Sequence, residues 1–212
     1  MFIWFFVSLF GFIATSPLYY LSLEHLKLKE KYGRRKAERI GGVYGIISGW
    51  GFFLFWFGIW FSPQSRFTIP VFQDLLVGVP ILNVTIPLLH LAVFVPFFAV
   101  GAWLGIKGVN ETTLKVAETH RAVKIVTTGV YSIVRHPQYL GGLLAHMGFC
   151  FLWSGLYSLL STPVVVAVVY LISRKEETEL TKEFGQEYLD YKKRTPSLLL
   201  KLKKSIKGYF AC

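Results

Sequence analysis

Long apolar stretches separated by basic segments constrain the fold of this chain more than any other feature. The apolar stretches cover residues 2–23, 41–62, 86–106 and 139–173. A helix needs about 20 apolar residues to cross the hydrocarbon core of a bilayer, and 53% of the 212 residues are hydrophobic. The sequence therefore predicts an all-α integral membrane protein.

The last apolar stretch is too long for one ordinary span. Residues 153–158 lie in its middle and contain the small and polar residues of a turn. We therefore predict a helical hairpin with helices near 137–154 and 157–173. Pro163 falls in the first turns of the second helix, where proline is tolerated. This hairpin brings the predicted number of transmembrane helices to about five.

The stretch 67–85 is apolar but is interrupted by Pro70, Asp74, Pro80 and Asn83. Proline inside a helix removes a backbone hydrogen bond and clashes with the preceding turn. We interpret this stretch as an interfacial or re-entrant connection, with a sixth span as the alternative.

The positions of Lys and Arg predict the orientation in the membrane. Segments 24–40, 107–138 and 174–212 hold 22 of the 23 Lys and Arg, and only Arg66 falls on the other side. By the positive-inside rule these segments face the cytosol, which puts the N-terminus outside and the C-terminus inside. Contact with anionic lipid headgroups accounts for the net charge of +11, so we expect no nucleic-acid partner.

The chain is predicted to be one domain with three parts. Residues 1–106 form a transmembrane scaffold, residues 107–196 carry most of the polar motifs, and residues 197–212 form a basic tail. Its two cysteines, Cys150 and Cys212, offer neither a disulfide framework nor a metal-binding motif. We therefore predict no metal site.

The most informative motif places an arginine and a histidine directly before a proline. Proline suits the first position of a helix, and the residue before it is disfavoured in the helical region. Pro137 should therefore start a helix whose free N–H groups attract anions, and Arg135 adds a planar fork for a carboxylate or phosphate. Tyr131 and Tyr139 can line a slot beside it. A basic collar with aromatic residues at the end of a span is the alternative interpretation.

An acidic pair, Glu176-Glu177, follows the second helix of the predicted hairpin. Because the two open ends of a hairpin are neighbours, this pair should meet Arg135-His136. A surface ion pair is the alternative, and such pairs contribute only about 0–1 kcal/mol. The convergence of two polar clusters at one membrane depth favours a functional site.

The residues after the acidic pair predict an amphipathic helix with one apolar face. This face holds Glu177, Leu180, Phe184, Tyr188 and Tyr191. A carboxylate on such a face is costly unless it has a partner. Gly185 weakens the helix locally and makes a bend possible there.

These motifs together resemble the isoprenylcysteine carboxyl methyltransferases and the related membrane phospholipid N-methyltransferases. The shared pattern is G-x-Y-x-x-x-R-H-P-x-Y, then a helical hairpin, then E-E followed by F-G-x-E-Y-x-x-Y-x-x-x-x-P. In this chain it falls on Gly129, Tyr131, Arg135, His136, Pro137, Tyr139, Glu176, Glu177, Phe184, Gly185, Glu187, Tyr188, Tyr191 and Pro196. The resemblance covers residues 125–196.

The resemblance implies a methyltransferase with S-adenosylmethionine as methyl donor, bound by residues 107–196 at the cytosolic side. It implies cofactor contacts from Tyr131, Arg135, His136, Pro137, Tyr139, Glu176 and Glu177. Of these, Arg135 and Glu177 are the catalytic candidates, and Arg174 and Tyr188 are the candidates for substrate contact. The implied acceptor is lipid-like or a prenylcysteine carboxylate, and a phospholipid amine or a small thiol is the alternative. The implied membrane is the cell membrane of a prokaryote or the endoplasmic reticulum of a eukaryote.

One position departs from the family pattern. Many relatives carry a histidine six residues before the motif glycine, where this chain has Val123, and His120 lies three positions away. One expected cofactor contact is therefore missing from the pattern.

Two other classes of function compete with this interpretation. Steroid-type membrane reductases that use NADPH share a His-Pro-x-Tyr element, but the acidic pair and the F-G-x-E-Y pattern fit the methyltransferases better. A non-enzymatic membrane scaffold is the second alternative. His90 and His146 lie within predicted spans, and we interpret both as hydrogen-bonded packing residues.

Overall fold

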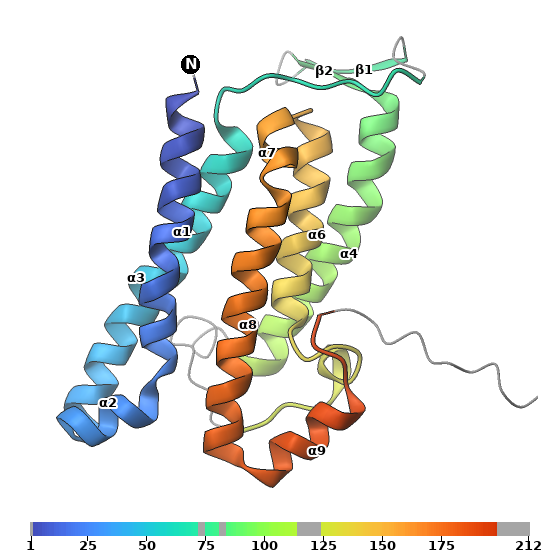
Figure 1. Ribbon diagram of the computed structural model, residues 1–212. Coiled ribbons are helices and arrows are strands. Elements are labelled where there is room, and N and C mark those ends of the chain that lie inside the picture. Colours follow the sequence, from blue (N-terminus) through green and yellow to red (C-terminus); the bar gives the residue numbers. More distant parts are fainter. Residues whose placement is uncertain (1, 72–74, 81–83, 114–123, 199–212) are drawn as a thin grey trace, which may run out of the picture.

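The computed structural model describes residues 2–71, 75–80, 84–113 and 124–198. They form an elongated bundle whose long helices run roughly along one common axis, with short helices across one end and two short strands at the other (Figure 1). In chain order the elements are α1 (Ile3–Leu23), α2 (His25–Tyr32), α3 (Arg34–Phe61), β1 (Leu76–Val79), β2 (Val84–Pro87), α4 (Leu88–Thr112), the 3-10 turn η2 (Gly129–Ser132), α6 (Pro137–Leu152), α7 (Leu156–Leu160), α8 (Thr162–Phe184) and α9 (Gln186–Arg194).

The predominantly helical fold confirms the sequence prediction. Among the described residues, α1, α3 and α4 are long and apolar enough to cross a membrane, by length and composition. Helix α3 begins at Arg34, earlier than predicted, because Gly33 with its positive φ of 73° separates α2 from a helix that already includes the basic residues. Helix α4 likewise continues to Thr112, past the predicted end of its apolar stretch.

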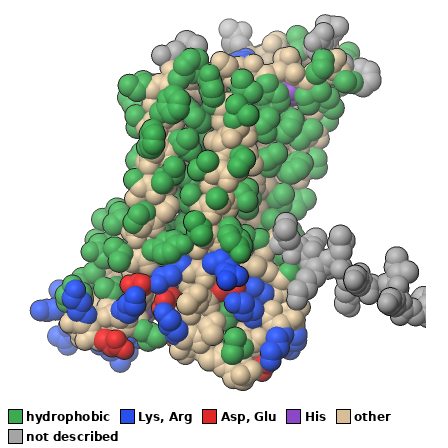
Figure 2. Space-filling view, in the orientation of Figure 1, with side chains coloured by type: hydrophobic (Ala, Val, Ile, Leu, Met, Phe, Trp, Pro, Cys, Tyr) green, Lys and Arg blue, Asp and Glu red, His purple; other side chains and the backbone are tan. Residues whose placement is uncertain are grey.

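Charged and apolar side chains are segregated along the bundle. Figure 2 shows hydrophobic side chains over most of its length, while Lys, Arg, Asp and Glu gather at one end. That end holds α2, α9 and the adjoining ends of the long helices (Figure 1). The motif residues of the sequence therefore lie at the charged end of an apolar bundle.

The connection between α3 and α4 contains a short two-stranded sheet. Strands β1 and β2 pair antiparallel, with Leu76 opposite Pro87. A strand needs about 9–11 residues to cross a bilayer, and each of these has four. The described residues of this connection contain no α-helix, so the alternative of a sixth helical span is not supported. Its backbone also joins the far end of the hairpin, where the Phe67 N–H donates to the carbonyl of Ser154 at 2.9 Å.

The helical hairpin is present where the sequence predicts it. Helix α6 begins at Pro137, and the chain turns after Leu152 through Ser154, which has a positive φ of 53°. Helix α8 then runs back to the charged end. Gly185, with a φ of 56°, ends α8 and lets α9 turn aside, as Figure 1 shows, which confirms the predicted bend.

Helices α4 and α6 cross at glycines. A Cβ added to Gly141 would lie 2.6 Å from the carbonyl oxygen of Gly101, and one added to Gly101 would lie 2.7 Å from that of Gly141. Farther along, a Cβ on Gly108 would lie 2.8 Å from the Cγ of Gln138. Small residues permit this close approach of helix backbones. The crossing sets the end of α4 beside the start of α6, where the polar motif begins.

A buried histidine joins three helices in the interior. The indole N–H groups of Trp56 and Trp60 in α3 both donate to Nδ1 of His146 in α6, at 3.1 and 2.8 Å. Nε2 of His146 lies 3.3 Å from Oγ1 of Thr162 in α8. His90 is also buried and hydrogen-bonds Ser154 through Nδ1 at 2.8 Å. Both histidines thus have the packing role that their positions predict.

Candidate functional site

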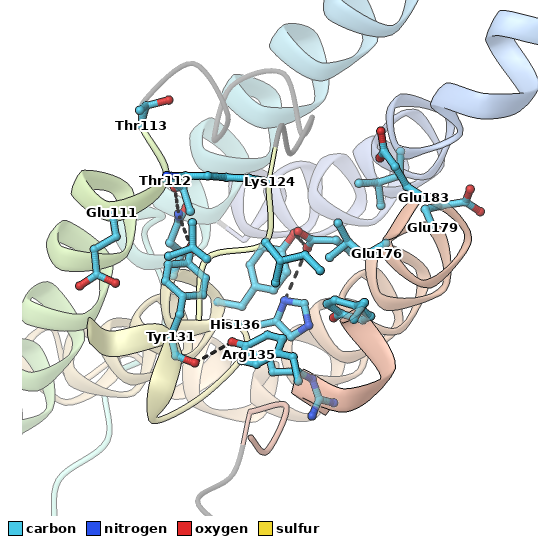
Figure 3. A pocket seen from close by; sticks show the side chains of 18 of the residues that line it. Glu111, Thr112, Thr113, Lys124, Tyr131, Arg135, His136, Glu176, Glu179 and Glu183 are labelled. Carbon is cyan, nitrogen blue, oxygen red and sulfur yellow. Dashed lines mark hydrogen bonds and ion pairs between the residues drawn. The ribbon is translucent and has the colours of Figure 1, made fainter. Parts of the chain in front are cut away.

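A cavity of about 370 Å³ lies at the charged end of the bundle. Small-molecule sites usually have volumes of about 300–1,000 Å³. Residues of α1, α4, α8 and α9 line the cavity together with the segment 124–139. Figure 3 shows carboxylates on both sides of it, with Glu111 opposite Glu179 and Glu183. The cavity therefore has an acidic lining at the predicted meeting point of the two motifs.

The turn before the Arg-His-Pro motif depends on a glycine and a carboxylate. Gly129 has a φ of 53°, and a Cβ there would overlap Oε1 of Glu111 at 1.9 Å. The same oxygen accepts the N–H of Val130 at 3.2 Å. Glu111 thus occupies the start of turn η2 and fixes the chain that leads to Arg135.

Arg135 and Glu177 form a buried ion pair. Nε of Arg135 donates to Oε1 of Glu177 at 3.0 Å, and a second guanidinium nitrogen binds the same oxygen. The third nitrogen donates to the carbonyls of Lys192, at 3.1 Å, and Thr195. The side chain of Glu177 is 2% exposed and that of Arg135 is 7% exposed. Every nitrogen of the guanidinium therefore already has an acceptor within the protein.

Glu177 also accepts hydrogen bonds from α9, from the segment that follows it and from the Arg-His-Pro motif. Lys192 Nζ lies 2.9 Å from Oε2, Ser197 Oγ donates to Oε1 at 2.8 Å, and His136 Nε2 lies 3.3 Å from Oε1. Burial alone would raise the pKa of Glu177, but hydrogen bonds from His136, Lys192, Arg135 and Ser197 outweigh it and hold that pKa well below its usual range. Glu177 is therefore ionised and fully engaged.

The segment 195–198 covers the backbone of the Arg-His motif. The N–H of Arg135 donates to the carbonyl of Pro196 at 2.8 Å, and that of His136 donates to the carbonyl of Ser197 at 3.2 Å. Tyr191 of α9 donates its hydroxyl to the carbonyl of Tyr131 at 2.6 Å. These bonds hold α9 and the segment 195–198 against the start of α6.

Glu176 faces the cavity beside His136 and Tyr139. The Tyr139 hydroxyl donates to its Oε2 at 2.8 Å, and His136 Nδ1 lies 3.5 Å from the same oxygen. Figure 3 shows His136 directed toward Glu176. Burial alone would lower the pKa of His136, but its hydrogen bonds to Glu176 and Glu177 outweigh burial and raise that pKa. The imidazolium form is thus stabilised between two carboxylates.

Two buried polar atoms of the cavity lining lack a partner among the described residues. They are the hydroxyl of Tyr188 and Oε2 of Glu111. A buried polar group without a hydrogen bond costs about 1–3 kcal/mol. Such atoms in a cavity lining fit a ligand that supplies the missing hydrogen bonds.

The structure brings most of the predicted site residues to one cavity. Tyr131, Arg135, His136, Tyr139, Glu176 and Tyr188 line it. Pro137 and Glu177 are buried next to these residues and are not part of the lining. Arg174, a predicted substrate contact, is exposed on α8, with its guanidinium 6.0 Å from the ring centre of Tyr170, and does not line the cavity. Positions 120 and 123, which bear on the missing family histidine, lie outside the described residues.

Several lining residues escaped the sequence analysis. Glu111 lies beyond the predicted apolar stretch 86–106, and its side chain reaches the cavity because α4 extends to Thr112. Glu179 is not one of the residues of the predicted apolar face, yet it lines the cavity and pairs with Lys175 and Lys182 at 3.0 and 2.8 Å. Tyr19 comes from α1, a part of the chain that contains no polar motif.

Known proteins match the part of the chain that holds most of this site. Residues 89–187 match the family model described as phospholipid methyltransferase. A protein named protein-S-isoprenylcysteine O-methyltransferase from Mus musculus is 38% identical over an alignment of 91 positions, which covers 38% of this chain and 28% of that protein. A protein named methanethiol S-methyltransferase 2 from Bradyrhizobium diazoefficiens is 37% identical over 75 residues, 34% of this chain and 27% of that protein. No solved structure gives a significant match.

These similarities have a limited extent. The chain spans little more than a quarter of the length of the mouse and Bradyrhizobium relatives. Within that extent, the family-model match contains both the Arg-His-Pro motif and the acidic pair that meet at the cavity. Residues 89–187 are therefore similar to the phospholipid methyltransferases, and part of the chain is similar to the isoprenylcysteine O-methyltransferases.

Proposed function

We propose that the chain is an integral-membrane methyltransferase that binds S-adenosylmethionine in the cavity at the open end of the hairpin. The observation that carries this proposal is the convergence of Arg135-His136 with Glu176-Glu177 beside a cavity of about 370 Å³. The unpartnered hydroxyl of Tyr188 and Oε2 of Glu111 in the same lining support a ligand with polar groups.

The lining fits the chemistry of this cofactor. S-adenosylmethionine carries a sulfonium and an ammonium group, and the cavity presents Glu111, Glu176, Glu179 and Glu183. Aromatic faces also attract cations, and four tyrosines of the hairpin region line the cavity: Tyr131, Tyr139, Tyr188 and Tyr191. We assign Glu176 to the ammonium group or the ribose of the cofactor. Lys124 lines the cavity with an exposed side chain and is the candidate for its carboxylate.

Arg135 and Glu177 have a different role in this proposal from that of direct catalytic contacts. The guanidinium is fully used by Glu177 and by two carbonyls, and the Glu177 carboxylate is not part of the cavity lining. We assign both residues to positioning, because they hold His136 and the segment 195–198 at the edge of the cavity.

Bound S-adenosylmethionine supplies an activated methyl group, since its sulfonium sulfur is a good leaving group. The protein then contributes alignment of the two reactants and exclusion of water more than acid–base catalysis. We propose a lipid-like acceptor, with a prenylcysteine carboxylate first, in line with the printed name of the mouse relative. A phospholipid amine and a small thiol are the alternatives, in line with the family description and the Bradyrhizobium relative.

The arrangement in the membrane is part of the proposal. Helices α6 and α8 run beside the three candidate spans and return to the same charged end (Figure 1), which supports five spans with the N-terminus outside. By the positive-inside rule the cavity then faces the cytosol. The acceptor reaches it from the bilayer, which is the cell membrane in a prokaryote or the endoplasmic reticulum in a eukaryote.

Calorimetric titration of the purified protein in detergent tests the proposal. We expect saturable binding of S-adenosylmethionine and none of NADPH, and binding of NADPH alone would favour a reductase. Glu176→Gln should weaken binding of S-adenosylmethionine about tenfold or more, as expected for loss of a hydrogen bond to a charged group. Glu187→Gln is the matched control, because Glu187 is exposed on α9 and does not line the cavity.

Transfer of labelled methyl then identifies the acceptor. A prenylated cysteine, phosphatidylethanolamine and a small thiol are offered separately in vesicles. Methylation of the prenylcysteine alone supports the first choice, and methylation of only one of the others replaces it.

A further inference from the structure

Tyr19 in α1 reaches the cavity from outside the region that matches the methyltransferase family. The residue is 7% exposed and belongs to the cavity lining. Its hydroxyl oxygen lies 2.9 Å from the hydroxyl oxygen of Tyr139 in α6, a residue 120 positions later in the chain. The family match begins only at residue 89.

The direction of this hydrogen bond follows from the next one. Tyr139 donates its hydroxyl proton to Oε2 of Glu176 at 2.8 Å. A tyrosine hydroxyl has a single proton, so Tyr139 accepts in its bond with Tyr19. The two hydroxyls therefore form a chain in which Tyr19 donates to Tyr139 and Tyr139 donates to the carboxylate. Each bond in such a chain polarises and strengthens the next.

We propose that Tyr19 is a positioning residue of the cofactor site, which fixes the Glu176 carboxylate through Tyr139. This inference rests on the proposed function, in which Glu176 contacts S-adenosylmethionine. Without the bond from Tyr19, the Tyr139 hydroxyl is a weaker donor and can rotate away from Glu176. The carboxylate then loses the hydrogen bond that links it to the scaffold through Tyr139, while the contact with His136 remains.

Helix α1 is held firmly enough to act in this way. The ring of Tyr19 packs against that of Phe52 in α3, with centroids 6.0 Å apart. Small residues let α1 and α3 approach closely, since a Cβ on Gly51 would lie 3.0 Å from Cγ2 of Thr15. Tyr19 is therefore fixed by packing within the first two long helices.

A second contact ties the end of α1 to the acidic pair. Glu24, which follows α1 directly, accepts from Nζ of Lys175 at 2.7 Å. Lys175 immediately precedes Glu176 in α8. The scaffold thus restrains the position of Glu176 twice, once through the side chain of Tyr139 and once through the helix that carries Glu176.

A double-mutant cycle for binding of S-adenosylmethionine tests the inference. Tyr19→Phe keeps the packed ring and should weaken binding about three- to tenfold, the equivalent of one neutral hydrogen bond. In the Tyr139→Phe background the chain is already broken, so Tyr19→Phe should then have no further effect. A packing role of Tyr19 would instead give the same loss in both backgrounds.

The neighbouring Tyr20 provides a matched control. It lies next to Tyr19 in α1 and does not line the cavity, so Tyr20→Phe should leave the affinity unchanged. If wild type binds and Tyr19→Phe binds equally well, or if the two losses are additive, the positioning role is overturned and the proposed function stands. If wild type does not bind S-adenosylmethionine, both proposals fail.

Discussion

Arg135 and Glu177, which are 42 positions apart in the sequence, form a buried ion pair that also anchors the end of the described chain. The pair joins the residue before the His-Pro step to the second glutamate of the acidic pair. Carbonyls of Lys192 and Thr195 complete the coordination of the guanidinium. The Arg-His-Pro motif and the acidic pair are therefore packed against each other, and the cavity lies beside this contact.

Removing either member of this ion pair should destabilise the protein strongly. Loss of one partner leaves the other charge buried and uncompensated, which typically costs about 3–5 kcal/mol. We expect Arg135→Gln and Glu177→Gln each to lower the thermal midpoint and to expose α9 to limited proteolysis. Arg174→Gln, at an exposed residue of α8, is the control and should change neither property. Wild-type protease resistance in both buried variants would disprove the anchoring role.

The Tyr188→Phe substitution should have opposite effects on stability and binding. The hydroxyl of Tyr188 is buried without a hydrogen-bond partner among the described residues, so its removal should leave the free energy of unfolding unchanged or raise it. The affinity for S-adenosylmethionine should nevertheless fall, because the hydroxyl is available to the ligand. Thermal unfolding and calorimetry on the same sample measure both quantities. A loss of stability with unchanged affinity would exclude Tyr188 from the ligand site.

The raised pKa of His136 predicts a stability change on the alkaline side. Its charged form is stabilised by Glu176 and Glu177 in the folded protein. The stabilising contribution is therefore complete below about pH 6.5, the ordinary value for histidine, and is lost as the pH rises through the higher pKa of the folded state. Thermal midpoints measured across this range should fall with pH in wild type. The fall should be smaller in His136→Gln, and equal slopes in both proteins would contradict the prediction.

The glycine crossing of α4 and α6 predicts a sharp contrast between two alanine substitutions. Gly141→Ala places a Cβ 2.6 Å from the carbonyl oxygen of Gly101, so the helices must move apart. Overpacking of this kind costs about 1–3 kcal/mol. Gly105→Ala, in α4, meets nothing within 4 Å and should be neutral or slightly stabilising, because alanine favours the helix. Equal thermal midpoints for the two variants would show that the crossing relaxes freely.

The fold was predictable wherever hydropathy and turn residues determine it. The start of α6 follows from Pro137, and the bend after α8 follows from Gly185, because both residues restrict the backbone locally. The strands β1 and β2 were missed because each has only four residues and their apolar residues resemble those of a membrane segment. The early start of α3 was missed because hydropathy reports the edge of the apolar stretch and not the end of the helix.

The sequence predicted which motif residues lie close together better than it predicted their contacts. The hairpin geometry brought Arg135, His136, Glu176 and Glu177 together as expected. The hydrogen bonds from the Arg135 guanidinium to Lys192 and Thr195 could not be predicted from the sequence, because their acceptors are backbone carbonyls. The contribution of Tyr19 was equally hidden, since it depends on how α1 packs against the hairpin.

The backbone bonds from Arg135 and His136 to Pro196 and Ser197 also impose an order in time. In a chain still being synthesised, both ends of the hairpin leave the ribosome before residues 195–198. Until then, the N–H groups of Arg135 and His136 lack these acceptors and Glu177 lacks Ser197. The contacts that complete this cluster therefore form last, after the whole hairpin has been synthesised.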